Sequence, residues 1–336
     1  MLGSAANALM RGSQNYQGFA KIGEVLHLDG PRISLEALST AVSHLQRRHP
    51  VLRSRLQINP EKPNSYLLEE DDTLQLKIRE ISRKRADHLT YWRREWRERE
   101  KETVAIVDMT NYCHTEISYG SLDKEITHEL VEKCRRESVT VTSAVNSAML
   151  CAITTLVSPS DDQRSALQFS IGADTRRRCI PSVPNHDLSY QVSCILPFTI
   201  PKSDIPTDCE GMWHLARTLA QYMKTSIDAN QILAIGIILG KLYQKMFGPP
   251  DLSLLPTYGN SSWGILPFRA QYTRWEFTGM TPFMNSVRGT TPFTMIQTVN
   301  GILTIIFIGN DPVLPLKIID DFRDRTMQKL HQMIAD

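Results

Sequence analysis

The sequence has no long hydrophobic run. Its longest apolar stretch, Ile232 to Leu239, is interrupted by Gly236 and is far shorter than the roughly 20 residues that a membrane-spanning helix needs. The first residues, MLGSAANALMRG, lack the basic start and apolar core of a secretory signal. We therefore expect a cytoplasmic protein without a transmembrane segment.

The sequence also lacks an excess of charge of either sign. Its 38 lysines and arginines and its 36 acidic residues leave a net charge of +2. A protein whose main partner is a nucleic acid or an acidic membrane usually carries a clear basic excess. We therefore expect no nucleic acid among the partners of this chain.

Cysteines at metal-binding spacing are absent. No two of the six cysteines stand at the CxxC spacing of a zinc site, so we expect no metal and no bound cofactor. Single, scattered cysteines in a chain of this length are typical of a reducing compartment. They are Cys113, Cys134, Cys151, Cys179, Cys194 and Cys209.

What is present is an ordinary globular composition, with 41% hydrophobic and 22% charged residues in a chain of 336. This length favours two domains. Residues 83–102 read as a charged helix, and their interleaved acids favour a solvated face over a nucleic-acid patch. Around residues 103–120 a short apolar run gives way to a polar linker. We place the domain boundary there, which gives the parts 1–118 and 119–336.

The segment from Leu35 to Ile58 predicts a helix, a sharp turn and a strand. Apolar residues recur at steps of three and four as far as Leu45, and Ser34 is placed to cap the first turn. Pro50 ends the helix because it clashes with the preceding turn. After Pro50 the period changes to two, as in a strand. Many amphipathic helices followed by a strand would show the same pattern.

The run RRHPVLRSRL in this segment resembles the RHPxLRxxF segment of the condensation-domain and CoA-dependent acyltransferase superfamily. Two further helices are similar to those that open the second half of this family. They are expected at Leu122 to Arg136 and, capped by Thr142, up to Leu156. The resemblance implies an α/β fold of two chloramphenicol-acetyltransferase-like domains, each a mixed sheet backed by helices. It also implies that the N-terminal domain is incomplete.

Two segments of the second half are similar to motifs of the family and supply the candidate structural or channel residues. Asp174-Thr175-Arg176, after a predicted strand, is similar to an Asp-Leu-Arg segment, and Pro181 follows as in the family. A scaffold ion pair is the alternative for Asp174 and Arg176. The segment from Tyr258 to Gly264 is similar to an SNxG segment near the acyl channel, and its alternative is a glycine-containing turn before a strand. Its candidates are Asn260, Trp263 and Gly264.

The family's catalytic motif, His-His-x-x-x-Asp-Gly, is missing. In the family the second histidine is the general base that takes the proton of the attacking hydroxyl or amine. No two of the nine histidines are adjacent, so no catalytic residue is carried over. A strand, the motif loop and a helix that should follow residue 102 are also absent. His114, in the expected linker, is the histidine nearest to this gap. An alternative transcript, a gene-model error or a decayed paralogue would each leave such a sequence.

The resemblance implies an acyltransferase-family protein that uses an acyl-CoA thioester as co-substrate and an alcohol or an amine as acceptor. Without the histidine motif, we expect this chain to be impaired or inactive. The alternative is a non-catalytic binding or scaffold protein of the same fold. A carrier-linked condensation domain is disfavoured, since no carrier or adenylation segment is present. The missing elements should expose apolar surface, so self-association through residues 20–110 is expected.

Overall fold

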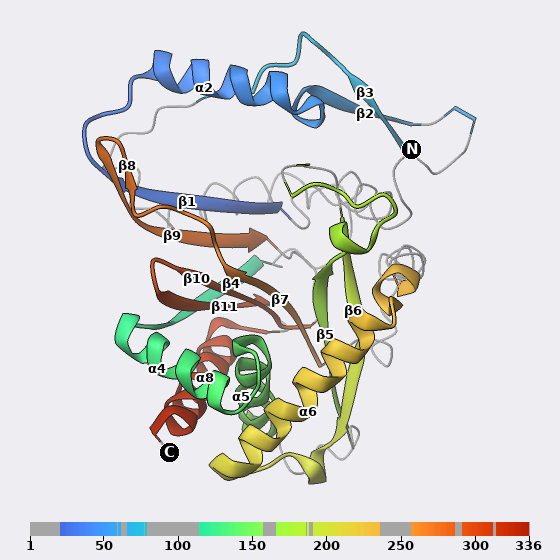
Figure 1. The fold of residues 1–336 in the computed structure, drawn as a ribbon, viewed down its shortest axis with the longest axis vertical. Coiled ribbons are helices and arrows are strands. Elements are labelled where there is room, and N and C mark those ends of the chain that lie inside the picture. The colour runs from blue at the N-terminus through green and yellow to red at the C-terminus, as the bar shows by residue number, and fades with distance from the viewer. Residues whose placement is uncertain are drawn as a thin grey trace.

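The computed structural model describes residues 21–58, 60–61, 66–76, 78, 114–156, 166–185, 187, 191–235, 257–285, 291–311 and 314–335. Figure 1 shows the arrangement of the helices and strands. The helices are α2 (Leu35–Arg48), α4 (Lys124–Arg136), α5 (Val141–Leu156), α6 (Cys209–Asp228) and α8 (Leu316–Ala335), with 3-10 turns η1 (Pro50–Arg53), η2 (Arg176–Arg178) and η3 (Lys202–Asp204). The strands are β1 (Lys21–Asp29), β2 (Ser54–Ile58), β3 (Tyr66–Glu70), β4 (His114–Leu122), β5 (Ala166–Asp174), β6 (Val192–Pro201), β7 (Tyr258–Ile265), β8 (Gln271–Tyr272), β9 (Trp275–Asn285), β10 (Phe293–Val299) and β11 (Ile302–Asp311).

A six-stranded mixed sheet forms the centre of the described structure, in the order β4-β11-β10-β7-β5-β6. Strand β7 runs parallel to both of its neighbours, β10 and β5, and the other pairs are antiparallel. Helices α4, α5, α6 and α8 lie together against this sheet (Figure 1). The expected class, an α/β fold with mixed sheets backed by helices, is confirmed.

Helix α5 is the central element of the hydrophobic core. Every residue from Ser143 to Ile153 is buried, because α6 and α8 pack against it and the sheet covers another side. Its sequence of alanine, serine and other small residues permits this close packing. The cap differs from the expected one. Thr140 Oγ1 accepts from the Ser143 N–H at 3.1 Å, and Ser143 Oγ accepts from the Thr140 N–H at 3.1 Å, so Thr142 is not the cap.

A second, three-stranded sheet joins the two ends of the described chain. Its order is β1-β9-β8, and β1 pairs with β9 in antiparallel register from Lys21 opposite Asn285 to Asp29 opposite Glu276. The first described strand is therefore hydrogen-bonded to a strand near the C-terminus. This pairing crosses the expected boundary at residue 118, and the division into two domains stays a prediction.

Helix α2 begins and ends where its sequence predicts. The Ser34 side chain accepts from the Ala37 N–H at 3.1 Å, and Pro50 follows the last turn. The strand starts later than expected, however, because η1 occupies Pro50–Arg53 before β2 begins at Ser54. Together with β2 and β3, α2 lies at the end of the molecule away from the C-terminus (Figure 1).

The structure also describes the segment expected as linker and the hairpin near the C-terminus. Residues 114–120, expected as linker, belong to strand β4 of the six-stranded sheet. Leu122, the expected start of the next helix, is the last residue of this strand, and α4 begins at Lys124. Strands β10 and β11 form a hairpin, with positive φ angles of 50° at Asn300 and 79° at Gly301, as a tight type I′ turn requires. The dipeptide Asn-Gly is typical of such a turn. The helix expected at residues 83–102 and the apolar run after it lie outside the described residues.

Within the described ranges, no single helix is long and apolar enough to span a membrane. Helices α4 and α5 meet the length and composition criteria only as a pair, bent by 100°. The buried position of α5 in the core accounts for its apolar composition.

Candidate functional site

Asp174 and Arg176 shape the turn that follows β5. The Asp174 Oδ1 atom accepts from the Arg176 N–H at 2.9 Å and lies 3.1 Å from Arg176 Nη1. Arg176 Nη2 also donates to the Asp187 carbonyl at 3.3 Å. A neighbouring contact, 3.3 Å between Arg178 and Asp228, ties the same turn to the end of α6. This geometry is that of an ion pair that holds the main chain of the turn in place. A channel role for the two residues stays a prediction.

Asn260 is a buried amide on β7. Its Nδ2 donates to Thr294 Oγ1 on β10 at 2.9 Å and lies 3.9 Å from the sulfur of Met149 on α5. Its Oδ1 is buried and has no hydrogen-bond partner within the described part of the chain. Buried acceptors are nearly always paired with a protein group or water. This oxygen can therefore accept a hydrogen bond from a small donor that reaches it.

Trp263 and Gly264 form a bulge in β7. The register with β10 passes from Ser262 opposite Ile296 directly to Gly264 opposite Gln297, so Trp263 is the extra residue. Gly264 has a φ of 67°, which side-chain-bearing residues rarely adopt, and a Cβ there would meet no atom within 4 Å. The backbone angle is therefore the reason for glycine at this position. The bulge places Trp263 in two small apolar clusters, one with Phe277, Met280 and Val299 and one with Met295, Ile306 and Ile308.

The structure places Asp174 at the end of β5, Arg176 in η2 and the other three candidates on the neighbouring strand β7, but it does not bring the five to one point. Strands β5 and β7 are neighbours, with Ile171 opposite Asn260. The Asn260 side chain points toward α5, whereas Trp263 donates to Ser261 Oγ at 3.1 Å and packs away from the helices. Because side chains alternate along a strand, the two residues lie on opposite faces of the sheet. They cannot line one surface together.

Gln297 is a further buried amide of this region, and it lies outside both family-like segments. It is 1% exposed, and its Nε2 donates to the Met280 carbonyl at 3.4 Å. Its Oε1 is buried and unpartnered among the described residues. A signal was present in the sequence, because Met295, Ile296 and Val299 surround Gln297 within the run from Phe293 to Val299.

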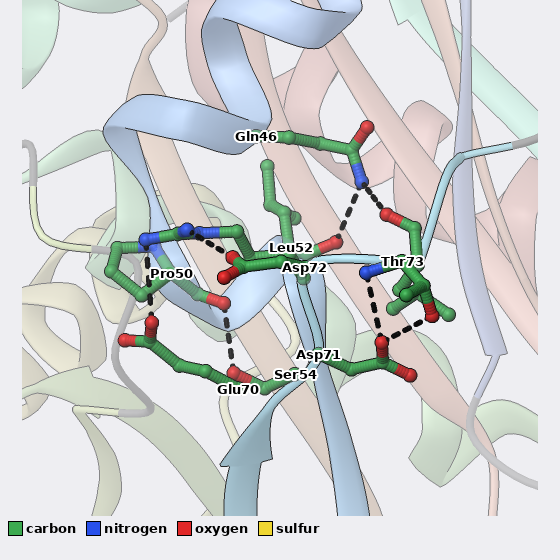
Figure 2. A network of polar contacts seen from close by, with 10 residues as sticks. Gln46, Pro50, Leu52, Ser54, Glu70, Asp71, Asp72 and Thr73 are labelled. Carbon is green, nitrogen blue, oxygen red and sulfur yellow. Dashed lines mark hydrogen bonds and ion pairs between the residues drawn. The ribbon is translucent and has the colours of Figure 1, made fainter.

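A separate polar network holds the segment that carries the family-like run RRHPVLRSRL (Figure 2). Gln46 Nε2 donates to the carbonyls of Leu52 and Leu74, both at 3.1 Å. Arg53 forms ion pairs with Glu70 at 3.4 Å and Asp72 at 2.7 Å. These contacts tie the end of α2 to η1 and to the end of β3. The network involves main-chain carbonyls and exposed acids, so it has a structural role.

The same turn contains a carboxyl group with an altered pKa. Hydrogen bonds from the side chain and the backbone of Thr73 lower the pKa of Asp71, and the nearby charge of Arg55 acts in the same direction. The carboxyl group is half-buried and pairs within the turn.

Three buried thiols are poor nucleophiles, and the described residues hold no cluster of metal ligands. Burial raises the pKa of Cys134 to about 12 and the pKa values of Cys151 and Cys194 to about 11, which makes these thiols poor nucleophiles. No group of three or more metal-ligating side chains occurs in the described ranges. His114 starts β4, opposite Asp311 on β11. The described side chains of this region show no arranged acid–base pair.

Residues 115–305 match the model of a protein family described as phthiocerol/phthiodiolone dimycocerosyl transferase C-terminus. The chain belongs to this family. The match starts in β4 and ends in β11, so it includes all five candidate residues. It confirms the resemblance to the superfamily of condensation domains and acyltransferases. No curated protein sequence matches the chain.

Solved structures of the same superfamily share the fold. Polyketide synthase associated protein 5 from Mycobacterium tuberculosis is 15% identical, with a TM-score of 0.67, over 98% of this chain and 97% of that one. The condensation domain of the Monacolin K polyketide synthase MokA is 9% identical, with a TM-score of 0.71, over 100% and 97%. The TRI3 trichothecene 15-O-acetyltransferase from Fusarium sporotrichioides is 11% identical, with a TM-score of 0.58, over 66% and 47%. At these identities the likeness establishes the fold.

Proposed function

We propose that this chain is an acyltransferase-family protein of the acyl-CoA-dependent type, with little or no turnover of its own. Its ancestral reaction moves an acyl group from a CoA thioester to an alcohol or an amine. The observation that carries the proposal is the absence of His-His-x-x-x-Asp-Gly from the sequence. Loss of a positioned general base typically lowers a rate by about 10²–10⁴.

One solved neighbour favours an alcohol over an amine as the acceptor. The family description names a transferase of acyl groups, and one solved neighbour is a 15-O-acetyltransferase, which acetylates an oxygen. A hydroxyl nucleophile must lose its proton as it attacks the thioester carbonyl. The missing base would therefore affect this reaction directly.

The second candidate function is binding without chemistry. The side chains of Asn260 and Gln297 each have a buried oxygen without a hydrogen-bond partner within the described residues. Trp263 packs beside β10, the strand that contains Gln297. Such groups can recognise a ligand without moving a proton. A cytoplasmic location would suit either function, since the scattered single cysteines of the sequence are typical of a reducing compartment.

The test is an assay of thiol release from a panel of acyl-CoAs with alcohol and amine acceptors. We expect release no faster than the uncatalysed reaction, while calorimetry reports whether acyl-CoA binds. Binding without release favours the non-catalytic protein. Robust release that survives His114→Ala would refute the missing-base argument, and release that this substitution abolishes would make His114 the base.

The genomic sequence between the codons for Glu102 and Asn111 provides an independent test. An intron that encodes His-His-x-x-x-Asp-Gly would make this chain an isoform of an active enzyme. Its insertion should then restore acyl transfer in the same assay. A continuous exon would favour the non-catalytic function.

A further inference from the structure

Helix α2 carries a line of apolar side chains that the rest of the molecule leaves exposed. Leu35, Leu38 and Leu45 are 50%, 39% and 50% exposed, and Val42 is half-buried. Among the described elements, α2 packs mainly against η1. We call Leu35, Leu38, Val42 and Leu45 the α2 stripe. A run of large apolar side chains on one exposed helix face usually marks an interaction surface.

The spacing of the α2 stripe indicates what kind of surface would cover it. Its members follow one another at steps of three, four and three residues. These are the a and d positions of a heptad, the narrow seam through which one helix packs against one other helix. Helix α5, which packs inside the core, is by contrast buried on all sides. The α2 stripe therefore suits a single partner helix.

The α2 stripe is symmetric about its own centre. Leu35 and Leu45 lie five residues on either side of Thr40, and Leu38 and Val42 lie two residues on either side. Two copies of α2 in antiparallel orientation would place Leu35 opposite Leu45 and Leu38 opposite Val42, with the same contacts repeated. Such a self-complementary surface is what a two-fold symmetric dimer requires.

Charges at the helix ends favour the antiparallel orientation. The first turn carries Glu36 and the last turn carries Arg47 and Arg48. Antiparallel pairing brings the basic turn of one copy to the acidic turn of the other, and it also opposes the two helix dipoles. Parallel pairing would bring the four arginines together. Beside the seam, Ser39 and Ala41 are small and uncharged, so the helices can approach closely.

We propose that α2 is a dimerisation helix, and that its stripe packs antiparallel against α2 of a second copy of this chain. Val51 and Leu76, which are 38% and 42% exposed in the segments that follow α2, would lie at the border of this interface. The inference does not depend on acyl transfer, because none of these residues belongs to the candidate site.

The first experiment measures mass by light scattering and sedimentation over a concentration series of the full chain. We expect a monomer–dimer equilibrium in the wild type and a dissociation constant at least about a hundredfold higher in Leu38→Glu, since each dimer loses two buried leucines. Ile318→Glu is the matched control, because Ile318 on α8 is 43% exposed and should leave dimerisation unchanged. Circular dichroism establishes that both variants fold.

The second experiment tests orientation by disulfide cross-linking. A mixture of Leu38→Cys and Val42→Cys chains should form covalent dimers under mild oxidation, beyond the background of the wild type, because these positions face each other. Stronger cross-linking of Leu38→Cys with itself would overturn the antiparallel arrangement. A wild type that stays monomeric at all concentrations would overturn the proposal. So would a Leu38→Glu variant that dimerises as strongly as the wild type.

Discussion

Buried hydroxyl and amide groups connect the middle of the six-stranded sheet to α5. The Tyr258 hydroxyl donates to Asn146 Oδ1 at 2.9 Å, and Asn146 Nδ2 donates to the Thr142 carbonyl at 2.7 Å. Thr142 in turn lies 2.8 Å from Ser262 through their hydroxyl oxygens. Burial keeps the pKa of Tyr258 well above its ordinary value, so this hydroxyl remains a donor. The chain of contacts fixes β7 against α5.

Tyr258→Phe should lower the free energy of unfolding by about 1–3 kcal/mol, because it removes a buried donor and leaves Asn146 Oδ1 without it. Tyr272→Phe is the control, since Tyr272 is 39% exposed and water can replace its hydroxyl. Urea unfolding measures both. An equal change in the two variants would contradict the importance of the buried contact.

The raised thiol pKa values have consequences for reactivity and for stability. At neutral pH, alkylation of Cys134, Cys151 and Cys194 in the folded chain should be slow, because their thiolate forms are rare. The unfolded thiols titrate near the model-compound value of 9.0 and the folded ones at about 11 or 12. As the pH rises, the unfolded state therefore loses these thiol protons before the folded state does. The stabilisation that this difference provides is complete below pH 9 and should be lost as the pH rises through 11. Peptide mass mapping after alkylation measures the reactivity of the three thiols. Urea unfolding across this pH range measures the loss of stability.

At the scale of elements, the start of α5 depends on a reciprocal cap. Thr140→Ala should lower the free energy of unfolding by about 1 kcal/mol, since the Ser143 N–H loses its acceptor. Thr218→Ala, at an exposed position of α6, is the control and should have a neutral or slightly stabilising effect, because alanine is the better helix former. Thermal unfolding of both variants gives the comparison. Equal destabilisation would show that the hydroxyl of Thr140 is not the cause.

Local chemistry determined which elements the sequence could predict. Ser34 and Pro50 bound α2, and Asn300-Gly301 fixes the β10–β11 turn, because each acts on backbone atoms within a few residues. The cap of α5 was misplaced because Thr140 and Thr142 are chemically equal, and only the partner Ser143 distinguishes them. The polar sequence of strand β4 predicted a linker, because the partners of its hydroxyl groups lie far away in the sequence. Ser118 Oγ, for example, donates to Asp320 Oδ1 at 2.6 Å.

In the candidate site, too, the sequence could predict only the features that depend on residues close together in the chain. The motif segment around Asn260 was found because its residues are adjacent in sequence. That Asn260 and Trp263 point to opposite faces follows from the strand and its bulge, neither of which the motif specifies. Gln297 lies opposite Gly264, and only the parallel pairing of β10 with β7 makes them neighbours.

At the scale of the whole molecule, the chain is unevenly packed. The core around α5 is fully buried, whereas the apolar residues of α2 are about half exposed. At concentrations below dimerisation, backbone amides of α2 should exchange with deuterium at least about 100-fold faster than those of α5, because local opening of α2 exposes little additional apolar surface. Hydrogen exchange followed by mass spectrometry measures the difference. Equal protection of the two helices in the monomer would contradict it.

The pairing of β1 with β9 also has a consequence for how the protein is made. His27 on β1 and Thr281 on β9, whose side chains lie 2.9 Å apart, are separated by 254 positions in the sequence. At a synthesis rate of about 5–20 residues per second, β1 leaves the ribosome roughly 10–50 seconds before its partner strand exists. During that interval an unpaired strand with apolar side chains is exposed to other nascent chains. The yield of folded protein should therefore depend on translation speed and on chaperones that hold the first residues until β9 arrives.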